Sequence, residues 1–129
     1  MSNAALSIRV FGIYLFCLGA LLIIIPGAFL TVFGFPEAGE VLGRVAGVLL
    51  VVLAYYYVMA STRELVSFYR WTVHGRLSVL LFFIAFVLLG LAPPVLILFG
   101  GIDASAALWT AACLRKDRAA GTLAPGNRR

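Results

Sequence analysis

Four apolar stretches, each long enough to cross a lipid bilayer as a helix, constrain this chain more than any other feature. They cover residues 8–25, 36–60, 76–92 and 94–115. A helix rises about 1.5 Å per residue, so about 20 mainly apolar residues span the hydrocarbon core of a membrane. The runs lack the alternating pattern of barrel strands, and lipid requires a backbone that satisfies its own hydrogen bonds. The sequence therefore predicts an all-α integral membrane protein, a four-helix antiparallel bundle.

The composition excludes a soluble domain of this size. Of the 129 residues, 64% are hydrophobic and 12% are charged, and a small soluble domain has too much surface to hide that share of apolar side chains. The formal net charge is +5. Because the basic residues flank the apolar runs, we interpret them as topology signals and headgroup contacts. The lipid bilayer is thus the predicted partner, and nucleic acid is not.

The distribution of Lys and Arg predicts the orientation of the chain. Basic residues occur at the start of the first run, from the end of the second run to the start of the third, and from the end of the fourth run onward. With four crossings these positions fall on one side of the membrane, so both termini should be cytoplasmic. Residues 117–129 are polar and contain Gly and Pro, which predicts a flexible cytoplasmic tail beside a transmembrane domain at 1–116.

Several connections allow two interpretations. The first run could be a signal peptide, but its weak charged region and the lack of a cleavage site favour a retained helix. Residues 28–35 could lie in the membrane interface, with Phe29, Phe33 and Phe35 at headgroup level, or continue the first helix. Residues 61–75 could form an interfacial helix opened by the capping-box spacing of Ser61 and Glu64, or extend the second helix.

Small and aromatic residues mark predicted packing faces and interface anchors. Gly39, Gly43 and Gly47 recur every four residues and would share one helix face, which lets another helix approach closely. The pair Gly100-Gly101 permits a bend or a close contact. The predicted interface anchors are Tyr55, Tyr56, Tyr57, Trp71, Trp109, Arg63, Arg70 and Arg76.

One carboxylate, Asp103, falls near the middle of the fourth run. A charge at that depth costs about 2.5–3.5 kcal/mol on insertion scales, so such an acid usually has a partner or a task. Arg44 in the second run is one candidate partner across the bundle. Glu40 precedes Arg44 by four residues and competes for it as a local ion pair. We therefore predict a binding site from Asp103, Arg44 and Glu40, with the pairing left open.

Other reactive groups give weaker signals. His74 stands alone in a basic stretch, so no metal site is predicted. Cys17 and Cys113 would differ in membrane depth by about 10 Å, too far for a disulfide, and are expected to be packing residues. The sequence has no phosphate-binding loop and no nucleophile motif, so no catalytic residue is predicted.

Parts of the chain resemble a known family. The resemblance rests on Gly43-Arg44, on Tyr55-Tyr56-Tyr57, on the segment Trp-Thr-Val-x-Gly-Arg at 71–76, and on Asp103 followed by Ala-Leu-Trp-Thr at 107–110. Residues 8–116 are similar to small four-helix bacterial membrane proteins of the DoxX-like kind. That resemblance implies a four-helix inner-membrane bundle. Some relatives are described as subunits of quinone-linked oxidoreductases, which makes a quinone a candidate ligand, but no catalytic motif of theirs matches this chain and no cofactor is predicted. Small multidrug exporters have similar length, but their essential acid lies in the first helix, where this chain has none.

Three functions remain open at this point. The favoured one is a non-catalytic subunit or binder of an apolar ligand of lipid or quinone type, acting alone, as a homo-oligomer or within a larger membrane complex. A proton-coupled transporter of small molecules would use Asp103 for proton exchange. A small membrane enzyme would use Asp103 as acid or base on an apolar substrate.

Overall fold

The computed structural model describes residues 2–35 and 39–121, which form five α-helices and no strand. The helices are α1 (Asn3–Ile24), α2 (Pro26–Val32), α3 (Glu40–Thr62), α4 (Val66–Leu88) and α5 (Val95–Ala119). The all-α prediction is confirmed for this part of the chain.

Four of these helices are long and apolar enough to cross a membrane. They are α1, α3, α4 and α5, with mean hydropathies of 2.2, 1.9, 1.8 and 1.6. Large apolar side chains cover much of their outer surface; Leu42 is 67% exposed, Leu81 is 68% exposed and Leu88 is 80% exposed. Exposure of such a surface is unfavourable in water and favourable in lipid. The architecture is therefore that of a multi-pass membrane protein.

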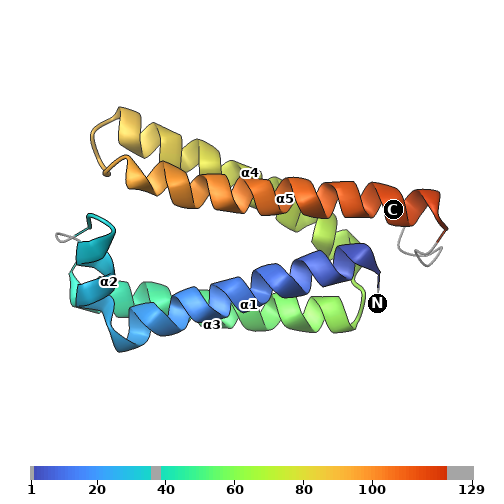
Figure 1. Cartoon of the computed structure of the whole chain (residues 1–129), viewed down its shortest axis with the longest axis horizontal. Helices are drawn as coiled ribbons and strands as arrows, with labels where there is room; N and C mark the ends of the chain where they lie inside the picture. The colour runs from blue at the N-terminus through green and yellow to red at the C-terminus, as the bar shows by residue number, and fades with distance from the viewer. Residues whose placement is uncertain (1, 36–38, 122–129) are drawn as a thin grey trace.

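The long helices are arranged as two pairs (Figure 1). Helix α1 packs along α3, and α4 packs along α5. The pairs meet at the end that holds the start of α1 and the end of α5, and they diverge toward the end that carries α2. One half of the bundle is therefore closely packed, and the other half is open between the pairs.

Glycines allow α1 and α3 to approach at backbone distance. A Cβ atom on Gly19 would lie 2.7 Å from the carbonyl oxygen of Gly47, and a Cβ on Gly47 would lie 2.7 Å from the carbonyl oxygen of Gly19. No side chain fits at these distances from a backbone atom, so the α1–α3 contact requires glycine at both positions. Gly43 packs on α2 instead, where its Cβ would lie 3.0 Å from the Leu30 side chain and 3.1 Å from that of Pro26.

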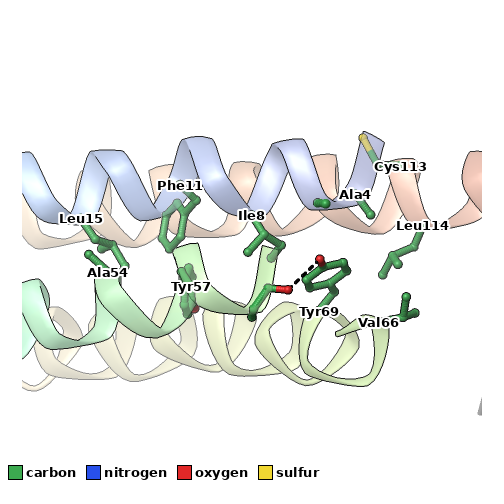
Figure 2. Close-up of a cluster of buried hydrophobic side chains, with 12 residues drawn as sticks. Ala4, Ile8, Phe11, Leu15, Ala54, Tyr57, Val66, Tyr69, Cys113 and Leu114 are labelled. Atoms are coloured by element: carbon green, nitrogen blue, oxygen red, sulfur yellow. Dashed lines mark hydrogen bonds between the residues drawn. The ribbon is translucent and has the colours of Figure 1, made fainter. Parts of the chain in front are cut away.

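The closely packed half contains the hydrophobic core (Figure 2). Ile8 and Phe11 of α1 pack with Tyr57 of α3 and Tyr69 of α4. The rings of Phe11 and Tyr57 lie 5.4 Å apart, and the hydroxyl of Tyr69 donates a hydrogen bond of 3.1 Å to the carbonyl oxygen of Ala60. That bond satisfies the one polar atom of a fully buried tyrosine.

The first turn of α1 is held by groups from distant parts of the chain. The Ser2 hydroxyl accepts a bond from the backbone N–H of Ala5, which caps the helix. The backbone N–H of Ser2 donates to Glu64 at 2.6 Å, and the backbone N–H of Ala4 donates to Asp117 at 2.9 Å. Carboxylates suit this end of a helix, where N–H groups lack intrahelical partners.

Several predicted boundaries are wrong. Helix α1 begins at Asn3 instead of residue 8, because the Ser2 cap starts it earlier. Residues 26–32 form the short helix α2, with Pro26 at its first position, which suits proline. Helix α3 runs from Glu40 to Thr62 where 36–60 was predicted, and the predicted start at 36–38 lies outside the described residues. Helix α5 continues to Ala119, so the first residues of the predicted tail are helical.

The largest error concerns residues 61–75, for which neither predicted arrangement is correct. Helix α4 begins at Val66 and runs to Leu88, where a helix at 76–92 was predicted. Residues 63–65 form the turn between α3 and α4, and Glu64 has a positive φ of 49° there. Leu65 precedes α4 without a side-chain cap. The predicted capping box does not form, because Glu64 accepts from Ser2 and Ser61 bonds to Val58.

Two of the predicted packing glycines have other surroundings. A Cβ on Gly39 or Gly101 would meet no atom within 4 Å. Gly39 instead has a φ of 80° and precedes the first turn of α3, a backbone conformation that favours glycine. Gly100 does pack against α4, where its Cβ would lie 3.0 Å from Leu80.

Replacement of Gly47 by alanine should destabilise the bundle, because the new methyl group would push α1 away from α3. We expect a loss of about 1–3 kcal/mol in the free energy of unfolding. Gly101→Ala is the matched control. It should raise the free energy of unfolding by about 0.5–1 kcal/mol, because alanine is more favourable than glycine within a helix and its methyl group would meet no other atom. Unfolding in detergent micelles, followed by circular dichroism, measures both; equal effects of the two substitutions would contradict the packing assignment.

The bond to Ser2 should make the N-terminal contact depend on pH. The backbone N–H of Ser2 lowers the pKa of Glu64, and this outweighs the opposite effect of desolvation. The folded protein then binds fewer protons than the unfolded one, so this stability is fully present at neutral pH. It is lost as the pH falls below the ordinary glutamate range toward the lowered pKa.

Hydrogen exchange of the first turn of α1, measured at several pH values, checks this expectation. Protection should decrease on acidification in the wild type, whereas Glu64→Gln should show low protection at every pH. A wild-type profile that remains flat through the acidic range would refute it.

An apolar cleft with a carboxylate in its wall

The open half of the bundle contains a cleft between the two helix pairs. Its volume is about 310 Å³, and all five described helices contribute to its wall. The lining residues are Tyr14, Leu15, Leu18, Leu22, Phe29, Leu30, Phe35, Ala46, Leu50, Phe83, Leu96, Phe99 and Asp103. All but Tyr14 and Asp103 have purely apolar side chains. The cleft can therefore take an apolar group along most of its wall and a polar group only near these two residues.

Phenylalanine rings connect the two pairs beside α2. The Phe99 ring of α5 lies 5.3 Å from Phe33, 6.4 Å from Phe29 and 6.5 Å from Phe35. Such separations are typical of favourable aromatic contacts. The sequence left open whether these three rings lie at headgroup level or continue the first helix. The structure places them against Phe99 of α5, where they bridge the diverging ends of the pairs.

Asp103 lies in the wall of the cleft, on the face of α5 that turns toward the other helices. Ala107 and Thr110 follow on the same face and are fully buried. The side chain of Asp103 is partly buried, and Tyr14 shares the wall with it. Its carboxylate thus borders a space that a ligand can enter and does not face the outer surface of the bundle.

A second polar group, Arg76 of α4, is buried in the closely packed half next to this position. Its side chain is 3% exposed. Nη2 donates a bond of 3.0 Å to the hydroxyl of Thr110 and one of 3.3 Å to that of Thr72, and Nε donates to the Thr72 carbonyl oxygen. Thr110 in turn lies 2.9 Å from the Ser7 hydroxyl. Hydroxyl groups of α4 and α5 therefore bind the guanidinium group, and Thr110 links them to Ser7 of α1.

Arg76 also lies against aromatic rings and close to the carboxylate. The carbon at the centre of its guanidinium group is 4.6 Å from the centre of the Phe11 ring and 5.9 Å from that of Tyr57. Rings at these distances stabilise a cation. The charge of Arg76 interacts with that of Asp103. Nη1 is buried and has no hydrogen-bond partner within the described ranges.

Of the two pairings that the sequence left open for Arg44, the structure forms the local one with Glu40. Arg44 is paired with Glu40 at 3.8 Å, and the two side chains are 52% and 65% exposed. Nε of Arg44 also donates to the carbonyl oxygen of Ile23. Asp103 has Arg76 as its cationic neighbour instead, so the three predicted binding residues do not come together.

The predicted interface anchors divide into two groups. Tyr55, Tyr56, Trp71 and Trp109 are exposed, by 60%, 54%, 67% and 43%, and remain available to lipid. Arg63 is exposed and Arg70 is partly buried. For Tyr57 and Arg76 the prediction is wrong, because both side chains are buried in the core and cannot reach headgroups.

The remaining reactive groups do not form a further site in the described part of the chain. Cys17 and Cys113 are both free thiols. Cys113 is buried, as expected of a packing residue, whereas Cys17 is exposed, so that expectation is wrong for Cys17. Within residues 2–35 and 39–121, no three His, Cys, Asp or Glu side chains are grouped to hold a metal ion.

Sequence reasoning missed Ser7, Thr72 and Thr110, and it placed Arg76 at the surface. The spacing of polar residues in the sequence contained a signal for this cluster. Asp103, Thr110 and Asp117 are each seven residues apart, so they share one face of a helix, and Thr72 precedes Arg76 by one turn. A polar face in an apolar helix indicates the side that is turned away from lipid.

Comparisons with protein-family models, with curated proteins and with solved structures find no match to this chain. The resemblance to DoxX-like membrane proteins therefore stays a prediction, and the site has to be interpreted from its own geometry.

The burial of Arg76 predicts a large stability effect for its removal. Arg76→Gln should cost about 1–3 kcal/mol, because it removes the bonds to the hydroxyls of Thr72 and Thr110 and the cation beside the Phe11 ring. Arg44→Gln is the matched control at an exposed pair and should cost about 0–1 kcal/mol.

A double-mutant cycle with Asp103→Asn measures the coupling between Arg76 and Asp103. In detergent micelles, the double variant should be more stable than the sum of the two single losses predicts. Strict additivity would show that these two charges do not act on each other.

Proposed function

We propose that this protein binds a lipid-like molecule in the cleft between its two helix pairs. It acts as a binding protein or as a small subunit of a membrane complex, without turnover of its own. One observation carries the proposal: the carboxylate of the last membrane-length helix lines an apolar cleft. Because a charge in the hydrocarbon region is costly, its placement at a space open to a ligand favours a role in recognition.

The proposed ligand has an apolar tail and one small polar head. The wall is apolar from Leu18 and Leu50 to Phe99, which suits a hydrocarbon or isoprenoid tail. Asp103 and Tyr14 would receive the head, since they are the polar side chains of the wall. The volume of about 310 Å³ falls at the lower end of the range of small-molecule sites. Lipids and quinones, the ligand classes predicted from the sequence, both have this build.

The proposed setting is the inner membrane of a bacterium, as the DoxX-like resemblance implies. The four long helices would cross it as an antiparallel bundle with both ends of the chain in the cytoplasm. Two observations support this topology. The amide of Asn3 donates a bond of 3.2 Å to Asp117, so the start of α1 and the end of α5 share one end of the bundle. The basic positions Arg9, Arg63 and Arg115 gather toward that end, as expected for a cytoplasmic side.

Photoaffinity labelling tests the proposal. The probe is decanol that carries a diazirine in its tail, added to the full chain in lipid nanodiscs. Labelled residues are mapped by peptide mass spectrometry. We expect saturable labelling of the cleft wall, including Leu50 and Phe99, which unlabelled decanol displaces.

A cleft-filling variant provides the control. Ala46 lines the cleft, so Ala46→Trp should reduce saturable labelling at least tenfold, a loss that corresponds to about 1.4 kcal/mol. Ala85 is exposed on α4 outside the cleft, and Ala85→Trp should leave labelling unchanged. Labelling that is spread over the outer faces and does not saturate would refute the proposed site.

A further inference from the structure

The two charged groups at the inner end of the cleft differ in their exposure to it. Asp103 is part of the cleft wall, whereas Arg76 lies behind the wall in the closely packed half. A carboxylate alone in an apolar cleft would select a cationic head, because opposite charges attract strongly where water is scarce. The position of Arg76 decides whether this carboxylate is alone.

The packing of α4 on α5 places Arg76 next to Asp103. A Cβ on Gly100 would lie 3.0 Å from Leu80, so these two residues are in contact. Arg76 precedes Leu80 by one turn, Asp103 follows Gly100 by about one turn, and Nη2 of Arg76 reaches Thr110. Arg76 therefore lies along the same stretch of α5 that runs from Asp103 to Thr110, about two helical turns.

Asp103 is the acidic partner that this geometry gives to the guanidinium group. Among the described residues, Asp103 is the carboxylate whose charge acts on Arg76, in agreement with the adjoining positions of the two residues on α5 and α4. The other contacts of Arg76 are the neutral hydroxyls of Thr72 and Thr110 and the ring of Phe11. The positive and negative charges of Arg76 and Asp103 thus compensate each other within one buried region.

We infer that the cleft selects an uncharged head that bears a hydrogen-bond donor, such as a hydroxyl group, over a cationic or an anionic head. This rests on the proposed function. A cationic head would add an excess positive charge beside buried Arg76, and an anionic head would add a negative charge beside Asp103. A hydroxyl donates to the carboxylate without either penalty, and it leaves the Arg76–Asp103 compensation in place.

Three probes with the same tail separate these alternatives. They are the tail-diazirine forms of decanol, decylamine and decanoate, and each is titrated against the full chain in nanodiscs. In the wild type, saturable labelling of the cleft should occur at a concentration at least tenfold lower for the alcohol than for either charged probe. This factor corresponds to the loss of one hydrogen bond to a charged group.

Variants should change the preference in opposite directions. Arg76→Gln leaves Asp103 uncompensated, so the amine should become the preferred probe. Asp103→Asn leaves Arg76 uncompensated, so decanoate should gain relative to the amine. The double variant carries neither charge at this position, so it should still disfavour both charged probes. It keeps the test valid if a single variant fails to fold. Arg44→Gln removes an exposed charge outside the cleft and should change nothing.

The outcomes for the two proposals are distinguishable. Saturable labelling with the wild type preferring decylamine or decanoate overturns the neutral-head inference and keeps the cleft as a binding site. Saturable labelling with the same preference in all variants also overturns it, because the pair would then not set selectivity. The absence of saturable cleft labelling by all three probes overturns the proposed function and this inference together.

Discussion

The buried guanidinium group of Arg76 is the interaction on which the arrangement of this bundle depends. A cation inside a membrane protein has to find partners within the protein, because lipid offers none. Its partners come from different helices: Thr72 on its own helix, Thr110 on α5, and the ring of Phe11 on α1. These contacts hold the two helix pairs together at one end, where the core also lies. At the other end the pairs diverge, the rings around Phe99 bridge them, and the cleft lies between them.

The two halves of the molecule thus differ in packing and in the groups that line them. The closely packed half contains fully buried residues such as Ile8 and Tyr69, and the Tyr69 hydroxyl is bonded to the carbonyl oxygen of Ala60. The open half is lined by apolar side chains and is bridged by the rings around Phe99. Asp103 lies where the halves meet. Its charge interacts with Arg76 of the closely packed half, and its side chain forms part of the cleft wall. A site of this kind can recognise a polar head without exposing the buried cation to lipid.

The fold was largely predictable from sequence, and the site only in part. Lengths of apolar runs determine membrane-length helices almost directly, because the bilayer sets the length. The start of α4 was mispredicted because Arg70 and His74 made residues 61–75 look aqueous, although a helix can carry such residues on its first turns. Asp103 was identified because a lone acid in an apolar run is conspicuous. Its partner was missed because flanking arginines are usually headgroup contacts, and only the tertiary packing shows that Arg76 points inward.

The carboxylate of Asp117 has a consequence for the way this chain is made. It accepts a bond from the backbone N–H of Ala4, so the first turn of α1 is completed by a residue of α5, a helix that is synthesised later. Until α5 is inserted, the first turn of α1 has to share its free N–H groups with water or headgroups. Membrane insertion of α1 and closure of the bundle are therefore separate events, and closure waits for α5.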